Sequence, residues 1–323
     1  MIAPEPIQFD RATGALEGAS ALERMAALAL VLGAKVSSTF SYRGYNFAAN
    51  VLRKALPTRD IAIKLNADAT FVFPYGDGYW SKLLQRDYDY EIELDLLFRG
   101  AADVDYTLVD CGANYGYWSV LVSSKPFGSH HVIAIEPSSQ NFSRLANNAR
   151  VNGGRFEVMR CAVGAKRGTA RLSGTKHEAF SIVGDADAPG EEVPVLRLDD
   201  LLDDGHLVPG GKYIVKLDVE GVEIEAIRGG ERLLQGDTAI LCEEHGSDRD
   251  HTVSRFILEH TPLKLAVYDP LSGKYEAVVD LAILDRIKVA SNVGYNVVGT
   301  ASAFWQARIE NLNASAHRRS MRN

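Results

Sequence analysis

The stretch that decides the fold reads LVDCGANYG and occupies residues 108–116. Two apolar residues lead into Asp110, and two glycines four positions apart, Gly112 and Gly116, follow before an apolar run of helical composition. This order predicts a strand, a tight turn and a helix start, through which an α/β sheet presents backbone N–H groups to a ligand. Glu136 ends the next apolar run, about 20 residues beyond the turn, where a carboxylate can accept hydrogen bonds from ribose hydroxyls. The sequence therefore predicts a nucleoside-cofactor site.

The residues of this turn favour a cationic cofactor over a dinucleotide. A nicotinamide-binding turn has the pattern G-x-G-x-x-G, in which the second glycine lets a pyrophosphate approach the backbone. Asn114 stands at that position, and Asp110 places a carboxylate where a polyanion would be repelled. The same carboxylate suits the amino group and the sulfonium of S-adenosylmethionine. We therefore predict S-adenosylmethionine as the cofactor, with an NAD-dependent oxidoreductase on a similar sheet as the alternative.

Size and composition predict a globular protein with one large domain, or with one domain and an appended one. The chain has 323 residues, of which 46% are hydrophobic and 24% charged. Its net charge of −7 gives no general attraction to nucleic acid or to an anionic membrane, so either partner would need a local patch. We predict no nucleic-acid partner.

The cysteines and the hydropathy of the sequence indicate in which cellular compartment the protein is expected. The three cysteines are widely spaced in apolar runs without a Cys-x-x-Cys pair, which disfavours a disulfide framework and structural zinc. They predict buried thiols in a reducing compartment. The most apolar early run, residues 25–36, is too short to span a bilayer and lacks the layout of a signal peptide. The sequence thus predicts a cytoplasmic protein without a membrane span.

From residue 106 onward, short apolar runs alternate with helical stretches. This alternation predicts right-handed βαβ crossovers and a mainly parallel sheet with both faces covered. The last apolar runs have little helix between them, which predicts antiparallel closing strands. The predicted elements are strands at 107–110, 132–136, 156–163, 213–218 and 239–244, helices at 117–124, 138–152 and 222–235, and closing strands at 263–268, 275–279 and 295–300.

The N-terminal part of the chain, residues 1–87, is expected to be an extension. It contains helical stretches at 15–32 and 47–56 and an alternating pattern at 61–74 that predicts a β-hairpin. We expect this extension to carry substrate specificity, and its apolar first helix offers a surface for a homodimer.

The catalytic domain is expected over residues 88–305, followed by a basic C-terminal tail over 306–323 that frays at its end. The polar stretch at 173–192 interrupts the alternation of strands and helices. A long loop beside a cofactor cleft is typical of a lid or a substrate loop.

Five motifs, in their order and spacing, resemble those of the FkbM-type methyltransferases. They are VDCGANYG at 109–116, Glu136-Pro137, CAVG at 161–164, LDDL at 198–201 and KLDVEGVE at 216–223. The resemblance covers residues 88 to 246. That family is similar to the class I S-adenosylmethionine-dependent methyltransferases and mostly methylates hydroxyl oxygens, often on sugars or secondary metabolites. It implies a Rossmann-like fold with a mainly parallel seven-stranded sheet and an antiparallel closing strand, and it implies O-methylation of a small-molecule or glycan hydroxyl.

The resemblance also implies roles for individual residues. Glu136 would hold the ribose, and adenine would lie against Pro137 and the segment that contains Cys161 and Ala162. Many class I enzymes place an acid or amide near adenine where this chain has Cys161, so Glu157 or a backbone group could replace that contact. The turn itself would be formed by Asp110, Gly112, Ala113, Asn114, Tyr115 and Gly116.

Five polar groups are expected to converge beyond the turn. Alternate side chains of a strand share a face, so Lys216, Asp218 and Glu220 point one way, and Glu243 and His245 share a face on the next strand. A positioned base that removes the proton from an acceptor hydroxyl accelerates methyl transfer. His245 is our first choice for that base, because its ordinary pKa of ~6.5 suits neutral pH. Asp218 and Glu243 complete the predicted catalytic group, with Asp218 beside the methionine end of the cofactor or orienting the acceptor.

Simpler roles remain open for these groups. Lys216 and Glu220 could form an ion pair, and Glu223 could stabilise a helix N-terminus. Asp218, Glu220, Glu243 and His245 could hold Mg²⁺ or Ca²⁺, which prefer oxygen ligands, but Lys216 would repel a cation and a compact Asp-x-Asp ligand loop is missing. A third possibility for the whole protein is a non-catalytic S-adenosylmethionine-binding protein.

Overall fold

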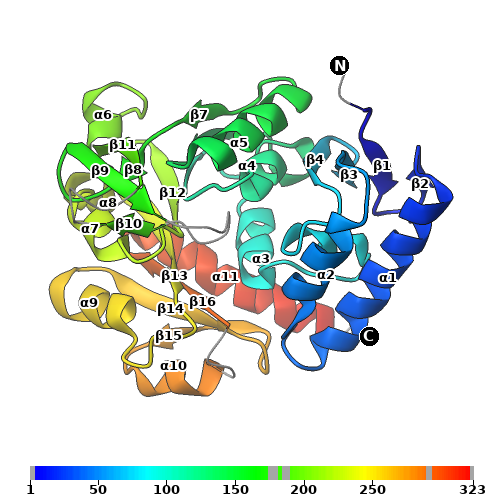
Figure 1. The fold of residues 1–323 in the computed structure, drawn as a ribbon. Coiled ribbons are helices and arrows are strands. Elements are labelled where there is room, and N and C mark those ends of the chain that lie inside the picture. Colours follow the sequence, from blue (N-terminus) through cyan, green and yellow to red (C-terminus); the bar gives the residue numbers. More distant parts are fainter. Residues whose placement is uncertain (1–3, 174–180, 184–189, 289–292, 321–323) are drawn as a thin grey trace.

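A sheet of eight strands runs through the centre of the molecule (Figure 1). The structure is a computed structural model, and it describes residues 4–173, 181–183, 190–288 and 293–320. The strands of this sheet are β5 (Thr107–Cys111), β6 (His131–Ile135), β7 (Glu157–Met159), β12 (Lys212–Leu217), β13 (Asp237–Glu244), β14 (Lys264–Asp269), β15 (Lys274–Val278) and β16 (Tyr295–Thr300). Their order in space is β15-β14-β16-β13-β12-β5-β6-β7.

The sheet confirms the predicted architecture. The neighbouring strands β7, β6, β5, β12 and β13 pair in parallel. β16 is antiparallel to β13 and to β14. β15 adds an antiparallel edge strand, so the sheet has eight strands rather than the seven expected. From β5 the chain continues outward on one side to β6 and β7, and the later strands β12 and β13 add to the other side of β5. The direction in which strands are added therefore reverses between β5 and β12. A crevice for a ligand is expected at such a reversal.

Helices cover both faces of the sheet. Neighbouring residues of β5 belong to different cores: Leu108 faces one, which contains α3, α4, α5 and α11, and Val109 faces the other, which contains α6 to α10. This is the alternation of a strand buried on both sides. The helices are α3 (Ile92–Gly100), α4 (Tyr117–Val122), α5 (Ser139–Val151), α6 (Asp200–Asp203), α7 (Glu223–Arg228), α8 (Glu231–Gln235), α9 (Thr252–His260), α10 (Ala282–Ile287) and α11 (Ala303–Ser320).

Two predicted elements are divided in the structure. The helix expected at 222–235 is two helices, because Gly229 and Gly230 separate them and Gly229 approaches the Gly164 carbonyl so closely that a Cβ would lie 2.1 Å from it. The strand expected at 156–163 leaves the main sheet after β7 and continues as β8 (Ala162–Val163) in a small second sheet. That sheet has the order β10-β9-β11-β8, with β9 (Gly168–Ser173), β10 (Ser181–Val183) and β11 (Glu191–Leu196).

The loop expected at 173–192 is therefore partly strand, since β10 and the start of β11 fall within it. Its remaining stretches, 174–180 and 184–189, lie outside the described residues.

The N-terminal extension forms a third sheet and two helices. The hairpin predicted at 61–74 is confirmed as β3 (Asp60–Asn66) and β4 (Ala69–Pro74), and two short strands that were not predicted extend it in the order β2-β1-β3-β4. The extension shares a core with the catalytic domain, since the ring of Phe71 meets that of Tyr117 edge to face, 5.6 Å away. The remaining elements are β1 (Ile7–Asp10), β2 (Leu16–Glu17), α1 (Ala21–Ser38), α2 (Tyr45–Lys54), η1 (Trp80–Leu84) and η2 (Lys125–Phe127).

Residues 306–320, expected as a basic tail, continue the helix α11. Trp305 and Ile309 are four positions apart and both buried, so one side of the helix packs on the core. Asn313 exchanges two hydrogen bonds of 2.8 Å with the backbone of Tyr275. Across the described part of the chain, helices that could cross a membrane are not found.

Candidate active site

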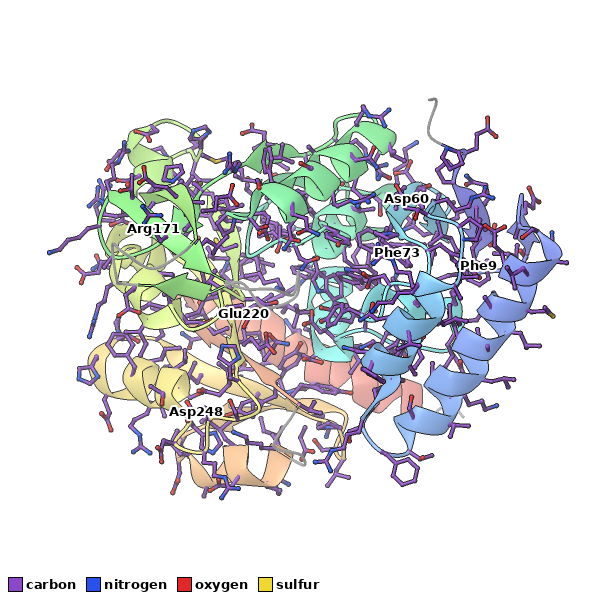
Figure 2. The ribbon with its side chains drawn as sticks, viewed as in Figure 1. Phe9, Asp60, Phe73, Arg171, Glu220 and Asp248 are labelled. Atoms are coloured by element: carbon purple, nitrogen blue, oxygen red, sulfur yellow. The ribbon has the colours of Figure 1, made fainter. Side chains whose placement is uncertain are left out.

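A cavity that is partly open to solvent lies at the carboxyl ends of β5, β6, β12 and β13. It therefore occupies the reversal point of the sheet, where open α/β sheets bind ligands. Leu172 of the small sheet and Trp80 of the extension also contribute to its wall. Figure 2 shows Glu220, a further wall residue, in the middle of the molecule between the regions that carry Arg171 and Asp248.

The predicted cofactor turn forms one part of this wall. The N–H groups of Gly112 and Ala113 donate to the carbonyl of Ile135 at 2.9 and 3.0 Å, which fixes the turn against β6. Gly112 has a φ of +74°, and a Cβ there would lie 1.7 Å from the carbonyl oxygen of Asp218, so only glycine fits. Asn114 also has a positive φ of 52°, a costly conformation that tends to occur at functional sites.

Two residues of the predicted turn do not line the cavity. Tyr115 is 2% exposed and belongs to the core, where its carbonyl accepts a hydrogen bond of 2.8 Å from Nδ2 of Asn148. Gly116 starts α4 with a φ of +84°, and a Cβ there would lie 2.5 Å from the Leu145 side chain. Both residues support the turn on the side that faces the core and not the cavity.

Glu136 lies at the end of β6 with its carboxylate in the wall. Its two oxygens accept N–H groups of Asn114 (2.8 Å) and Ser138 (2.9 Å), and the side chain of Asn141 adds a third hydrogen bond. Burial nevertheless raises the pKa of Glu136 to about 8. Because two carboxylate oxygens can accept about four hydrogen bonds, Glu136 keeps acceptor capacity for ribose hydroxyls. Asn141 was not predicted as a wall residue, although it lies in the first turn of the helix that follows Glu136.

The wall beside Glu136 is apolar. Pro137, Cys161 and Ala162 line it as predicted, together with Ile135 and Val163. Burial raises the pKa of the Cys161 thiol to about 12, so this side chain is neutral and acts as a small apolar group. Such a surface fits the faces of an adenine ring, and these residues together with Glu136 fit a nucleoside.

Carboxylates outnumber cations at the ends of β5 and β12. Asp110 is 1% exposed and accepts a hydrogen bond of 2.6 Å from Ser119 Oγ. Lys216 is the one cationic side chain in the described wall, and its Nζ lies 2.8 Å from Asp218 Oδ2. Burial alone would lower the pKa of Lys216, but the carboxylates of Asp218, Glu91 and Asp110 raise it and keep the group charged. The local excess of negative charge fits a cofactor with an ammonium and a sulfonium group.

Lys216 thus pairs with Asp218 and not with Glu220, the partner left open by the sequence. Glu91 was missed by sequence reasoning, because it falls in a polar stretch outside any motif. It has a positive φ of 47°, and Trp118 Nε1 donates a hydrogen bond of 2.5 Å to its carboxylate. Burial raises the pKa of Glu91 to about 7.

Four of the five polar groups predicted to converge line the wall: Lys216, described above, and the acids Asp218, Glu220 and Glu243. The carboxyl groups of Glu243 and Asp218 are hydrogen-bonded to each other, and burial together with the Asp218 charge raises the pKa of Glu243 well above its usual range. A hydrogen bond between two carboxyl groups needs a proton, and the opposite shifts of the two pKa values place it on Glu243, which donates to Asp218. Burial and the nearby Asp218 raise the pKa of Glu220 to about 7, and its φ of 56° is again positive. Glu223 closes this loop from behind by accepting the N–H groups of Val219 and Gly221, both at 3.2 Å.

His245, predicted as the base, does not line the cavity. When His245 carries a proton, its charge lowers the pKa of Glu220 against the effect of burial. Within the residues that the structure describes, no group of three or more His, Cys, Asp or Glu side chains is arranged to hold a metal ion, and this includes the four candidate ligands Asp218, Glu220, Glu243 and His245.

Aromatic side chains form the rest of the wall, and the extension supplies two of them. The hydroxyl groups of Tyr79 and Tyr90 are hydrogen-bonded at 2.9 Å, and Trp80 stacks on Tyr117 with ring centroids 5.6 Å apart. Trp80 is only 3% exposed, because the aromatic cluster covers it. Residues 1–87 are thus part of the site.

Comparison with known proteins finds a methyltransferase domain in the part of the chain that carries the cofactor turn. The Methyltransferase FkbM domain matches residues 110–262, a stretch that begins at the cofactor turn and includes all the acidic and basic groups described above except Glu91. A curated relative, the hexuronic acid methyltransferase AglP of Haloferax volcanii, is 25% identical over 219 residues, which are 65% of this chain and 89% of that protein.

Solved structures of methyltransferases are also similar to this chain. Methyltransferase FkbM from Methylobacillus flagellatus KT is 17% identical with a TM-score of 0.39, and the match covers 60% of this chain and 43% of that one, so this chain spans less than half of its length. Precorrin-6y C5,15-methyltransferase from Geobacter metallireducens GS-15 is 14% identical with a TM-score of 0.37 and coverages of 66% and 88%. The fold assignment rests on the sheet order described above and not on these scores. The chain has the class I methyltransferase fold, uses S-adenosylmethionine and carries a Methyltransferase FkbM domain over residues 110–262.

Proposed function

We propose that this methyltransferase transfers the methyl group to a hydroxyl oxygen of a sugar or of another hydroxylated metabolite. The observation that carries the proposal is Glu220, a carboxyl group in the cavity wall whose pKa is raised to about 7. An unactivated hydroxyl must lose its proton during methyl transfer, and a base is most effective when its pKa lies near the working pH. The relative AglP, by its name, methylates a hexuronic acid, which is a hydroxylated sugar.

The cofactor is proposed to lie along the wall from Glu136 to Asp218. S-adenosylmethionine supplies the electrophilic methyl group when it is bound. Glu136 would accept the ribose hydroxyls, and Pro137, Cys161 and Ala162 would contact the adenine. The remaining wall residues, Asp110, Gly112, Ala113, Asn114 and Asp218, would hold the positively charged methionine end.

We assign the proton acceptor to Glu220 rather than to His245, which lies outside the wall. Asp218 is ionised but already engaged by Lys216 at 2.8 Å, and Glu243 is protonated and donates to Asp218. These two groups would orient the site, while Glu220 retains a titratable carboxyl. His245 lies close enough that its protonated form would stabilise ionised Glu220.

The acceptor is proposed to meet the aromatic part of the wall. Tyr79 and Trp80 come from the extension, so residues 1–87 would select the acceptor together with the catalytic domain. Hydroxyl groups such as the Tyr79–Tyr90 pair can hydrogen-bond a sugar, and the ring edges give it an apolar surface. A glycan or small-molecule hydroxyl is the substrate class that this mixture supports.

The test is turnover with a panel of acceptors. The protein is incubated with S-adenosylmethionine and with uronic acids, neutral hexoses or hydroxylated aromatic metabolites, and S-adenosylhomocysteine is quantified. We expect turnover with at least one hydroxylated acceptor and its loss in Glu220→Gln. Methylation confined to nitrogen or carbon acceptors would overturn the proposal, and cofactor binding without turnover on any acceptor would favour the non-catalytic alternative.

A further inference from the structure

One side of α1 presents large apolar side chains to solvent. Met25 is 64% exposed and Leu28 is 60% exposed, whereas Leu30, on the opposite side of the helix, is 2% exposed. The exposed residues recur every three or four positions, which places them on one face. We call the full set the apolar stripe; it consists of Leu22, Met25, Leu28, Leu32 and Val36 of α1, Phe40 of the connection, and Phe47 and Val51 of α2, each at least 50% exposed.

The exposed large apolar residues of the described chain are concentrated in this stripe. Of the fourteen large apolar residues that are exposed in the described chain, eight belong to the stripe. Single exposed apolar residues are normal, but a contiguous patch marks an interaction site. Gly33 of α1 lies against the ring of Tyr45 of α2, so the two helices are neighbours, and Figure 1 shows them side by side on the outer surface of the extension.

The stripe is bordered by basic residues in a chain that is acidic as a whole. Residues 20–58 contain five Lys or Arg and a single acid, Glu23, although the chain has a net charge of −7. Glu23 is 2% exposed and pairs with Arg59 at 3.4 Å, so it does not offset the surface charge. By helical spacing, Arg24 and Lys35 flank the stripe on α1, and Lys54 follows it on α2.

The basic residues distinguish two possible partners of the apolar stripe, a second copy of the chain and a membrane surface. In a symmetric dimer the same surface meets itself, so Arg24, Lys35 and Lys54 of one copy would lie near the same residues of the other and repel them. A membrane with anionic headgroups offers negative charge to the basic border and an acyl boundary to the apolar residues. We propose that the α1–α2 face docks in the plane of a membrane surface that is rich in anionic lipids.

The docking surface adjoins the active site. Gly78 N–H donates to Asn50 Oδ1 of α2 at 3.3 Å, and Gly78 belongs to the turn that leads into Tyr79 and Trp80 of the cavity wall. A membrane in contact with α2 would therefore be separated from the acceptor side of the site only by the turn that contains Gly78. The proposal does not depend on which reaction the site performs.

Vesicle flotation of the full chain tests this proposal. The protein is mixed with vesicles of phosphatidylcholine alone or with added phosphatidylglycerol. The test variants are Leu28→Gln/Leu32→Gln in the stripe and Lys35→Glu/Lys54→Glu in its border. The matched control is Leu271→Gln/Val279→Gln, since these residues are 87% and 89% exposed outside the stripe. Circular dichroism verifies that each variant is folded.

We expect the parent and the control to float only with the anionic vesicles and to be released by high salt. Each lysine-to-glutamate change should weaken binding by more than about fivefold, because it removes a cation and adds an anion, and the stripe variant should lose binding. Failure of the parent to float, or equal flotation of the stripe variant, would overturn the proposal. A second copy would be the occupant if the parent instead sediments as a dimer that the stripe variant makes monomeric.

Discussion

Replacing Lys216 with methionine is expected to destabilise the fold by roughly 3 kcal/mol. Lys216 is 3% exposed, and its ammonium lies 2.8 Å from Oδ2 of Asp218. Removing one partner of a buried ion pair costs about 3–5 kcal/mol, because the other charge stays buried without a partner. The Asp218 side chain is 22% exposed, so water screens part of its charge and the lower end of that range applies.

The assay is urea unfolding followed by circular dichroism at pH 7. Lys64→Met is the matched control, because Lys64 pairs with Asp10 at 3.1 Å while its side chain is 54% exposed. That exposed pair should contribute less than ~1 kcal/mol. The double variant Lys216→Met/Asp218→Asn removes both charges and should be clearly more stable than Lys216→Met alone.

The same pair predicts a pH dependence. Burial alone would raise the pKa of Asp218, but the charge of Lys216 holds it below its usual range. The stabilisation is therefore fully present above the unfolded-state pKa of ~3.9 and is lost as the pH falls through the lowered pKa. The difference between the parent and Lys216→Met should shrink below pH ~4. The reasoning is refuted if Lys216→Met costs no more than Lys64→Met, or if the double variant is as unstable as the single one.

Three further predictions concern the turn, the proposed base and the junction with the extension. Gly112→Ala should abolish S-adenosylhomocysteine binding in calorimetry, because its Cβ would lie 1.7 Å from the Asp218 carbonyl oxygen; binding at parental affinity would contradict the close approach. The methyl-transfer rate should rise with pH through about 7 and then level, and Glu220→Gln should remove this rise, whereas an unchanged profile would exclude Glu220 as the base. Asn148→Ala should lower the free energy of unfolding by roughly 2–4 kcal/mol, because Asn148 makes three buried hydrogen bonds to the backbone of Val72 and Tyr115; a loss below ~1 kcal/mol would show that the extension is held by other contacts.

Much of the sheet could be predicted, because hydrophobic periodicity and the glycine turn are local signals. The strand that ends at Asp110 and the acid Glu136 at the next strand end both stand where the sequence indicated. The division of the helix at Gly229 depends on the approach of Gly164, a contact distant in sequence. Residues 306–320 were read as a tail for the same kind of reason, since the core that receives Trp305 is assembled from several elements.

The candidate site was predicted less completely. The alternation of side chains brought Asp218, Glu220 and Glu243 together correctly, but it could not show that His245 lies past the end of the wall. Asn141 in the wall and Glu91, which bonds the wall residue Trp118, both lie outside the five motifs. The ionisation of Glu220 and Glu243 follows from burial and from each neighbouring charge, which only the folded arrangement determines.

The wall between Glu136 and Asp218 is proposed to hold the cofactor, and calorimetry with S-adenosylhomocysteine at pH 9 tests this placement. At that pH Glu136, with a pKa of about 8, is largely ionised and can accept the ribose hydroxyls. We predict that the parent binds and that Glu136→Gln weakens the affinity roughly 10- to 150-fold, the loss of one charged hydrogen bond of about 1.5–3 kcal/mol. Lowering the pH below 8 should weaken the parent more than the variant. Equal affinity of the two proteins at pH 9, or no binding by the parent, would contradict the account.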